Sequence, residues 1–141
     1  MTNEIFKSLL RELPVSVNNL ADPTILREST EEKLNALMED GHTGPVGLIT
    51  KGNLDTPWWK ERLATWAAHL NLFVFASISE LPKEMEPVGT EHRYRTLKVA
   101  REAGARAIAY VRPIIHTVND DPVTIRRIFQ RSVESGCDAI I

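Results

Sequence analysis

The sequence predicts an α/β fold in which five parallel strands alternate with helices, and two observations carry that prediction. Short apolar runs typical of strands begin near residues 15, 46, 72, 107 and 138, so successive starts are 26–35 residues apart. That interval is the length of one strand-plus-helix unit. Every interval also contains a helix-like segment, so parallel pairing with right-handed crossovers is the expected topology.

The first half of the chain is expected to hold two helices around a short strand. Residues 3–13 carry large apolar side chains at helical spacing, and Pro14 ends this helix. Residues 15–19 alternate briefly and predict a strand, which breaks before Asp22-Pro23. A helix is then expected over 24–40, closed by two glycines in the following turn.

The second half repeats the same alternation. Thr56 is expected to cap a helix whose first turn holds Pro57, because a hydroxyl oxygen there accepts from the first free amides. The run 72–79, LFVFASIS, is rich in aromatic and β-branched residues and is the clearest strand. The remaining expected elements are a helix over 91–104, a strand over 107–115, a helix over 122–135 and a strand over 138–141.

Polar residues follow the second predicted strand at the point where its apolar run stops. Residues 45–53 read PVGLITKGN, so Lys51 and Gly52 come directly after a buried strand. Open α/β sheets and barrels build their sites at these carboxyl ends. Lys51 is therefore either a solvated residue or an anion-binding group, and Gly52 permits close approach of a ligand to the backbone.

Composition is that of an ordinary single globular domain spanning residues 1–141. Apolar residues make up 43% and charged residues 26% of the chain, and the net charge is −2. This charge gives no support for binding to nucleic acid or to anionic membranes. No apolar window is long enough to span a bilayer and no signal-like pattern opens the chain, so the expected location is cytoplasmic.

Metal-binding side chains are sparse. Cys137 is the only cysteine, which excludes an intramolecular disulfide and any thiolate cluster built by this chain alone. Its two interpretations are a small buried apolar residue and a reactive thiol. The four histidines lie in separate units without metal-ligand spacing, so no metal site is predicted.

The chain is expected to be an incomplete parallel (βα) barrel. Five strands are three units short of an eight-stranded barrel, and the last strand runs apolar to Ile141. Its sheet edges are expected to be exposed, which favours self-association or assembly with a chain that supplies the missing strands.

Four segments, in order and with matching spacing, point to a known family. Three are strand ends, at 49–52 (ITKG), 76–79 (ASIS) and 112–115 (RPII); the fourth, at 86–105, opens with Glu86-Pro87 and has Arg95 nine residues on. Together they resemble radical S-adenosylmethionine (SAM) enzymes, most closely the spore photoproduct lyase-like group, also described as DNA-repair photolyase-like.

The resemblance implies a six-stranded (βα)6 TIM-like barrel, of which this chain is similar to strands two to six. Such a barrel binds SAM across its upper rim beside a 4Fe-4S cluster. The family's Cys-x3-Cys-x2-Cys triplet is absent here, so the cluster ligands are missing. DNA as a substrate would rest on analogy alone.

The family pattern assigns candidate SAM-binding residues to three strand ends. Lys51 matches the lysine that lyase-like members present to the SAM carboxylate. Arg112 faces the same rim, where it contacts an anion or pairs with Glu86 or Asp120. The resemblance places Arg95 near the Glu86-Pro87 loop, for which a structural bond is the favoured role.

Serine and asparagine complete the candidate set. Ser77 and Ser79 flank one residue with period two and are expected to face the same side of the sheet, the barrel interior. The alternative is that they bond neighbouring backbone. Asn18, at the end of the first strand, either binds polar groups of the ligand or forms the turn before Asp22-Pro23.

Two functions follow from these observations. The first is a fragment or degenerate copy of a radical SAM enzyme that retains the SAM-binding rim without the cluster cysteines and is inactive alone. The second is a non-enzymatic α/β half-barrel that binds a small ligand or assembles with another chain. In both, a small molecule is the expected ligand, and the substrate of the family reaction is not encoded in these residues.

Overall fold

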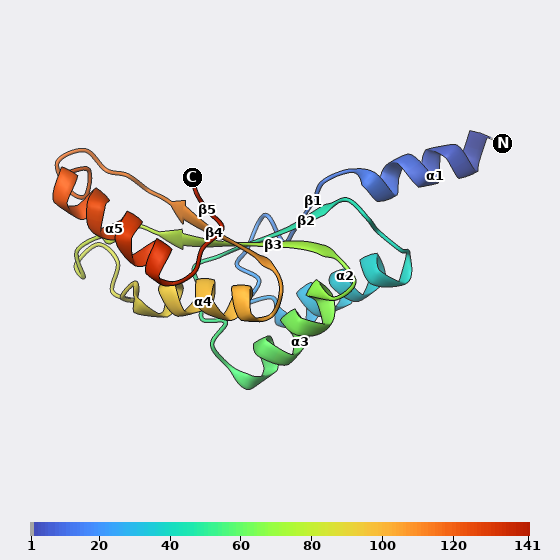
Figure 1. The fold of residues 1–141 in the computed structure, drawn as a ribbon, viewed down its shortest axis with the longest axis horizontal. Helices are drawn as coiled ribbons and strands as arrows, with labels where there is room; N and C mark the ends of the chain where they lie inside the picture. The colour runs from blue at the N-terminus through green and yellow to red at the C-terminus, as the bar shows by residue number, and fades with distance from the viewer. Residues whose placement is uncertain (1) are drawn as a thin grey trace.

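A five-stranded parallel sheet with the order β1-β2-β3-β4-β5 forms the centre of the computed structural model, which describes residues 2–141 (Figure 1). The predicted α/β class and the parallel pairing of all five strands are confirmed. The strands are β1 (Val15–Val17), β2 (Pro45–Thr50), β3 (Asn71–Ile78), β4 (Arg106–Val111) and β5 (Ala139–Ile140). The helices are α1 (Thr2–Glu12), α2 (Arg27–Glu39), α3 (Pro57–Ala67), α4 (Glu91–Glu102) and α5 (Pro122–Glu134).

The core lies between the sheet and the helices under it. Parallel register aligns Val17, Leu48, Val74 and Ala107 in one row across four strands, and all four are buried. In Figure 1, α2, α3 and α4 lie under this face, with α5 beside α4. The helices contribute large buried side chains to the same cluster, chiefly Leu34, Leu63, Trp66, Leu97 and Ile128. Burying such residues on one face is what fixes the strand register.

The opposite face of the sheet has no helix over it in Figure 1. We call it the open face; alternation along the strands assigns to it Gly47, Ile49, Phe73, Phe75, Ile108 and Tyr110. The rings of Phe73 and Phe75 stack with centroids 6.4 Å apart, and both side chains are only half-buried. The sheet therefore presents an apolar surface opposite its helices.

Helix α1 stands apart from the other helices (Figure 1). Its end is tied to the turn before β2, where the backbone amides of Thr43 and Gly44 each donate to the Arg11 carbonyl at 2.9 Å. Arg11 also forms an ion pair with Asp40, at 3.0 Å. A Cβ on Gly44 would lie 2.4 Å from the Glu12 carbonyl oxygen, so only glycine permits this close approach.

The structure corrects four predicted boundaries. The first strand ends at Val17 rather than residue 19, because Asn18 has a φ of 57° and leaves the extended conformation. The helix predicted over 24–40 begins at Arg27, since Thr24 is held in a turn by Asp22. The strand predicted over 107–115 ends at Val111, before Pro113, which has no amide to continue the ladder. The last strand is only Ala139–Ile140.

The predicted cap of α3 is confirmed, since the Trp59 amide donates to Thr56 Oγ1 at 3.4 Å. Within residues 2–141, no helix is both long and apolar enough to cross a membrane.

Candidate functional site

The carboxyl ends of β1, β2 and β3 and the residue after β4 surround one hollow of about 300 Å³. We call it the rim hollow. Four of the five candidate residues, Asn18, Lys51, Ser77 and Arg112, line it, together with Asp22 and Thr50. Parallel strands bring their carboxyl ends to one edge, which is why residues up to 94 positions apart in the chain meet here. Ser79, the fifth candidate, does not line it.

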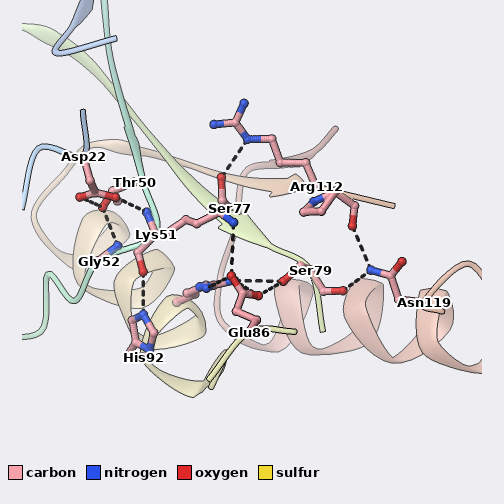
Figure 2. A network of polar contacts seen from close by, with 12 residues as sticks. Asp22, Thr50, Lys51, Gly52, Ser77, Ser79, Glu86, His92, Arg112 and Asn119 are labelled. Carbon is pink, nitrogen blue, oxygen red and sulfur yellow. Dashed lines mark hydrogen bonds and ion pairs between the residues drawn. The ribbon is translucent and has the colours of Figure 1, made fainter. Parts of the chain in front are cut away.

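Arg112 and Ser77 form a direct contact across two neighbouring strands (Figure 2). The Arg112 Nε–H donates to Ser77 Oγ at 3.0 Å, and the guanidinium lies over the Tyr110 ring, 4.3 Å from its centroid. Among the described residues, no side chain or carbonyl accepts from its two terminal nitrogens. An arginine held in this way presents a planar pair of donors suited to a carboxylate.

Neither ion pair considered for Arg112 forms. Glu86 instead pairs with Lys51 and Arg93, and Asp120 pairs with His116 at 2.7 Å.

Lys51 is fixed through its backbone and its side chain. Its amide donates to Asp22 Oδ2 at 2.6 Å, and its carbonyl oxygen lies 2.7 Å from His92 Nε2. Its Nζ lies 3.2 Å from Glu86 Oε1, while about half of the side chain is exposed. The ammonium group is thus positioned beside the rim hollow but remains within reach of a ligand from solvent.

Asp22 holds the end of β2 in place. Its carboxylate accepts from the Thr24 amide and hydroxyl at 2.9 and 2.7 Å, from the Thr50 hydroxyl at 2.8 Å and from the Lys51 amide. Burial alone raises the pKa of Asp22, but the hydrogen bonds from Thr24, Lys51 and Thr50 outweigh it and lower the pKa. Asp22 was predicted only to break the first strand, although its position just before a proline is typical of a turn held by the aspartate side chain.

Glu86, which contacts Lys51 in Figure 2, also forms an ion pair with the buried Arg93. Arg93, only 2% exposed, donates from Nη1 to Glu86 Oε2 at 2.9 Å and from Nη2 to Glu86 Oε1, and the Ser79 hydroxyl also bonds Glu86. Burial by itself raises the pKa of Glu86, but the bonds and charge from Arg93, with those from Ser79 and Lys51, bring it to about 2.

Arg93, and not the predicted Arg95, contacts the Glu86-Pro87 loop. Arg95 lies 3.4 Å from Asp55, away from the Glu86-Pro87 loop, so its expected bond to that loop is wrong. The spacing held a signal, because Arg93 precedes Leu97 and Ala100 by four and seven residues and so lies on the buried stripe of α4.

Ser79 belongs to a second network that joins the ends of β3 and β4. Asn119 is fully buried; its Nδ2 donates to the carbonyls of Ser79 and of Pro113, the latter at 2.9 Å, and its Oδ1 accepts from the Ile115 amide. Ser77 and Ser79 therefore do not line one hollow: Ser77 lines the rim hollow, whereas Ser79, one residue past the end of β3, directs its hydroxyl to Glu86.

Asn18 lines the rim hollow, but its side chain is already occupied. Its Nδ2 donates to Thr30 Oγ1 and its Oδ1 accepts from Lys33 Nζ, both on α2. Its carbonyl accepts from the Ala21 amide at 3.3 Å, closing the turn before Asp22. Of the two roles considered for Asn18, the contacts match the turn.

A second hollow, of about 740 Å³, adjoins the first, and Asp22 and Lys51 line both. Its wall is largely apolar, with Ile25, Met85 and Val88 exposed around it. The two hollows together offer a charged rim next to an apolar surface, the usual composition of a small-molecule site.

The low pKa of Glu86 predicts a loss of stability in acid. The unfolded chain takes up this proton near pH 4.5 and the folded chain only near pH 2, so the stabilisation is complete above about pH 5 and is lost between pH 4.5 and 2. The shift corresponds to about 3 kcal/mol at most, and partial solvent access reduces it to about 2 kcal/mol. Urea unfolding of the protein at pH 6, 4 and 3 measures it.

The Glu86→Gln variant is the control, because it lacks this titration while keeping the other carboxylates. The difference in unfolding free energy between the two proteins should shrink as the pH falls. A constant difference would show that Glu86 has an ordinary pKa.

Metal ligands are not gathered at the rim. Burial, followed by the charge of Asp138, raises the pKa of the Cys137 thiol, which lies just before β5, at the opposite end of the sheet. Among residues 2–141 no group of three or more His, Cys, Asp or Glu side chains is placed to hold a metal ion. The residues of this chain therefore do not fit a 4Fe-4S cluster, which needs three thiolates.

Comparison with protein-family models gives no matching family, and comparison with curated proteins gives no significant match.

Proposed function

We propose that this chain is a fragment or degenerate copy of a radical SAM enzyme of the lyase-like group, and that its rim hollow binds SAM. The strand order supports a barrel-type origin. Strands in a (βα) barrel follow one another in sequence order with helices on one side, whereas doubly wound sheets reverse their order at a switch point. The sheet here runs β1 to β5 without reversal.

The observation that carries the proposal is the convergence of Lys51, Ser77 and Arg112 on one hollow from three successive strands. SAM carries a carboxylate, for which the Lys51 ammonium and the free face of the Arg112 guanidinium are suitable partners. The Ser77 hydroxyl can bond a ribose or amino group. The adjoining 740 Å³ hollow provides apolar surface for the rest of a ligand of this size.

Cleavage of SAM is not part of this proposal for the chain alone. The family reaction requires a 4Fe-4S cluster, and the single cysteine does not supply its ligands. What these residues do is bind and orient: Asp22 fixes the Lys51 backbone, and Ser77 fixes Arg112.

Isothermal titration calorimetry with SAM tests the proposal. We expect saturable binding, weakened about 10-fold or more by Lys51→Ala, because a hydrogen bond to a charged group contributes about 1.5–3 kcal/mol. The matched control is Lys98→Ala, which removes an exposed lysine on α4 that forms a long ion pair with Glu102, at 3.9 Å. Absence of SAM binding, or equal loss in both variants, would contradict the proposal.

The second candidate is a non-enzymatic half-barrel that binds another small anion. The half-exposed Lys51 and the free edge of Arg112 favour it, since neither is specific for SAM. Titration with simple carboxylates separates the two, because a SAM site is expected to prefer SAM strongly over acetate or methionine. Equal affinities would favour the second candidate.

A further inference from the structure

Helix α1 and the residue after it carry an apolar stripe that is about half exposed among the residues that the structure describes. Ile5, Phe6, Leu9, Leu10 and Leu13 recur at helical spacing and are 46–60% exposed. Contiguous exposed apolar side chains of this kind commonly mark an interaction surface. The stripe is therefore a candidate contact surface.

The open face of the sheet is a second uncovered apolar surface in the same chain. A hollow of about 510 Å³ lies on it, lined by Gly47, Ile49, Phe73 and Phe75 together with Pro14 at the start of β1. The helices α2, α3 and α4 lie on the other side of the sheet (Figure 1). Both apolar surfaces thus lie near the β1 edge.

The attachment of α1 directs it away from its own sheet. The Thr43 and Gly44 amides hold the Arg11 carbonyl, and the ion pair between Arg11 and Asp40 holds the side chain of the same residue. In Figure 1 the helix extends outward past the start of β1. Covering its own open face would require breaking these contacts.

We infer that two copies of this chain associate by exchanging α1, so that each helix lies on the open face of the other copy. One chain carries both halves of the contact, and a two-fold symmetric pair covers all four surfaces at once. A different protein on the open face would leave the α1 stripe exposed. A second copy is therefore the occupant that these two surfaces favour.

The dimensions of the two surfaces match. An 11-residue helix is about 16 Å long, and the four strands from β1 to β4 span about 14 Å at a spacing of about 4.8 Å. Taking roughly 150–200 Å² for each large apolar side chain, the five residues of the stripe leave about 450 Å² uncovered. Two exchanged helices and the faces beneath them would bury about 1,800 Å², within the range of about 1,200–2,000 Å² for stable interfaces.

The exchanged helix would also border the rim hollow. Ile49 lines both that hollow and the apolar hollow of the open face. The second copy thus covers the side of the rim hollow next to Ile49, whatever ligand the rim hollow binds.

Size-exclusion chromatography with light scattering at several protein concentrations tests the exchange. We expect a mass of about 32 kDa, twice the 15.9 kDa of the chain. The double substitution Phe6→Asp with Leu9→Asp should raise the dimer dissociation constant at least about 100-fold, since it places two charges in the stripe. The matched control is Ser8→Glu, which adds a charge to the polar side of α1 and should leave the dimer intact.

A substitution on the sheet distinguishes exchange from other modes of pairing. Phe73→Glu alters only the open face and should also give a folded monomer, with the circular dichroism of the parent. Mixing it with the α1 variant should restore a dimer, because one intact helix then meets one intact face. A monomeric parent, a dimer that survives Phe73→Glu, or no dimer on mixing would each overturn the exchange.

Discussion

Replacing Glu86 with alanine is expected to lower the free energy of unfolding by about 3–5 kcal/mol, because it leaves the buried charge of Arg93 without its counter-ion, with only the Ser79 hydroxyl still accepting from Nη1. Arg93 is 2% exposed, and both of its terminal nitrogens donate to Glu86. The substitution also frees the Ser79 hydroxyl and Lys51 Nζ, which both contact this carboxylate. Urea unfolding followed by circular dichroism measures the change.

Two further variants test whether the lost stability comes from breaking the ion pair between Glu86 and Arg93. Glu84→Ala, an exposed position in the same loop, should leave stability nearly unchanged. Replacing both partners, Glu86→Leu with Arg93→Met, should recover much of the loss, since apolar side chains of similar size often substitute for a buried ion pair. A small effect of Glu86→Ala alone would show that Arg93 reaches solvent when its partner is removed.

The fold class was predictable because burial leaves two different periods in the sequence. Strands such as 72–79 are apolar with β-branched and aromatic residues, and the intervening helices repeat apolar residues every three or four positions. Boundaries were less predictable: Asn18 adopts a positive φ, and Thr24 is held by its bonds to the nearby Asp22, and periodicity registers neither.

The rim was predictable for a simpler reason. Once strands are parallel, the residues that follow them must meet at one edge, so Lys51, Ser77 and Arg112 could be placed together without coordinates. Arg93 and Asn119 could not, because their partners lie 7 and 40 residues away and charge or polarity alone predicts exposure.

The open face shows what the apolar pattern of a strand does not predict, namely which surface covers it. Phe73 and Phe75 face one side of β3 and Leu72 and Val74 the other, so the strand is apolar on both faces. A strand of this kind predicts cover on both sides. The helices of this chain cover one side, and the pattern does not say which molecule covers the other.

The Asp22→Ala substitution is expected to lower the free energy of unfolding by about 2–4 kcal/mol, because four donors lose one acceptor. Two of them are backbone amides, those of Thr24 and Lys51, and the Thr50 hydroxyl is buried. Urea unfolding measures this loss. Asp40→Ala is the matched control, since that carboxylate is exposed and its ion pair with Arg11 lies at the surface.

The same substitution should weaken ligand binding at the rim, although the negative charge of Asp22 does not itself attract an anionic ligand. Its role is to position Lys51. Without Asp22 the Lys51 amide loses its acceptor, so the backbone that carries the ammonium group is no longer held in place. We therefore expect Asp22→Ala to weaken SAM binding about as much as Lys51→Ala, by about 10-fold. Lost stability with unchanged SAM affinity would mean that ligand recognition at the rim rests on Ser77 and Arg112, on the neighbouring strands, and not on the end of β2.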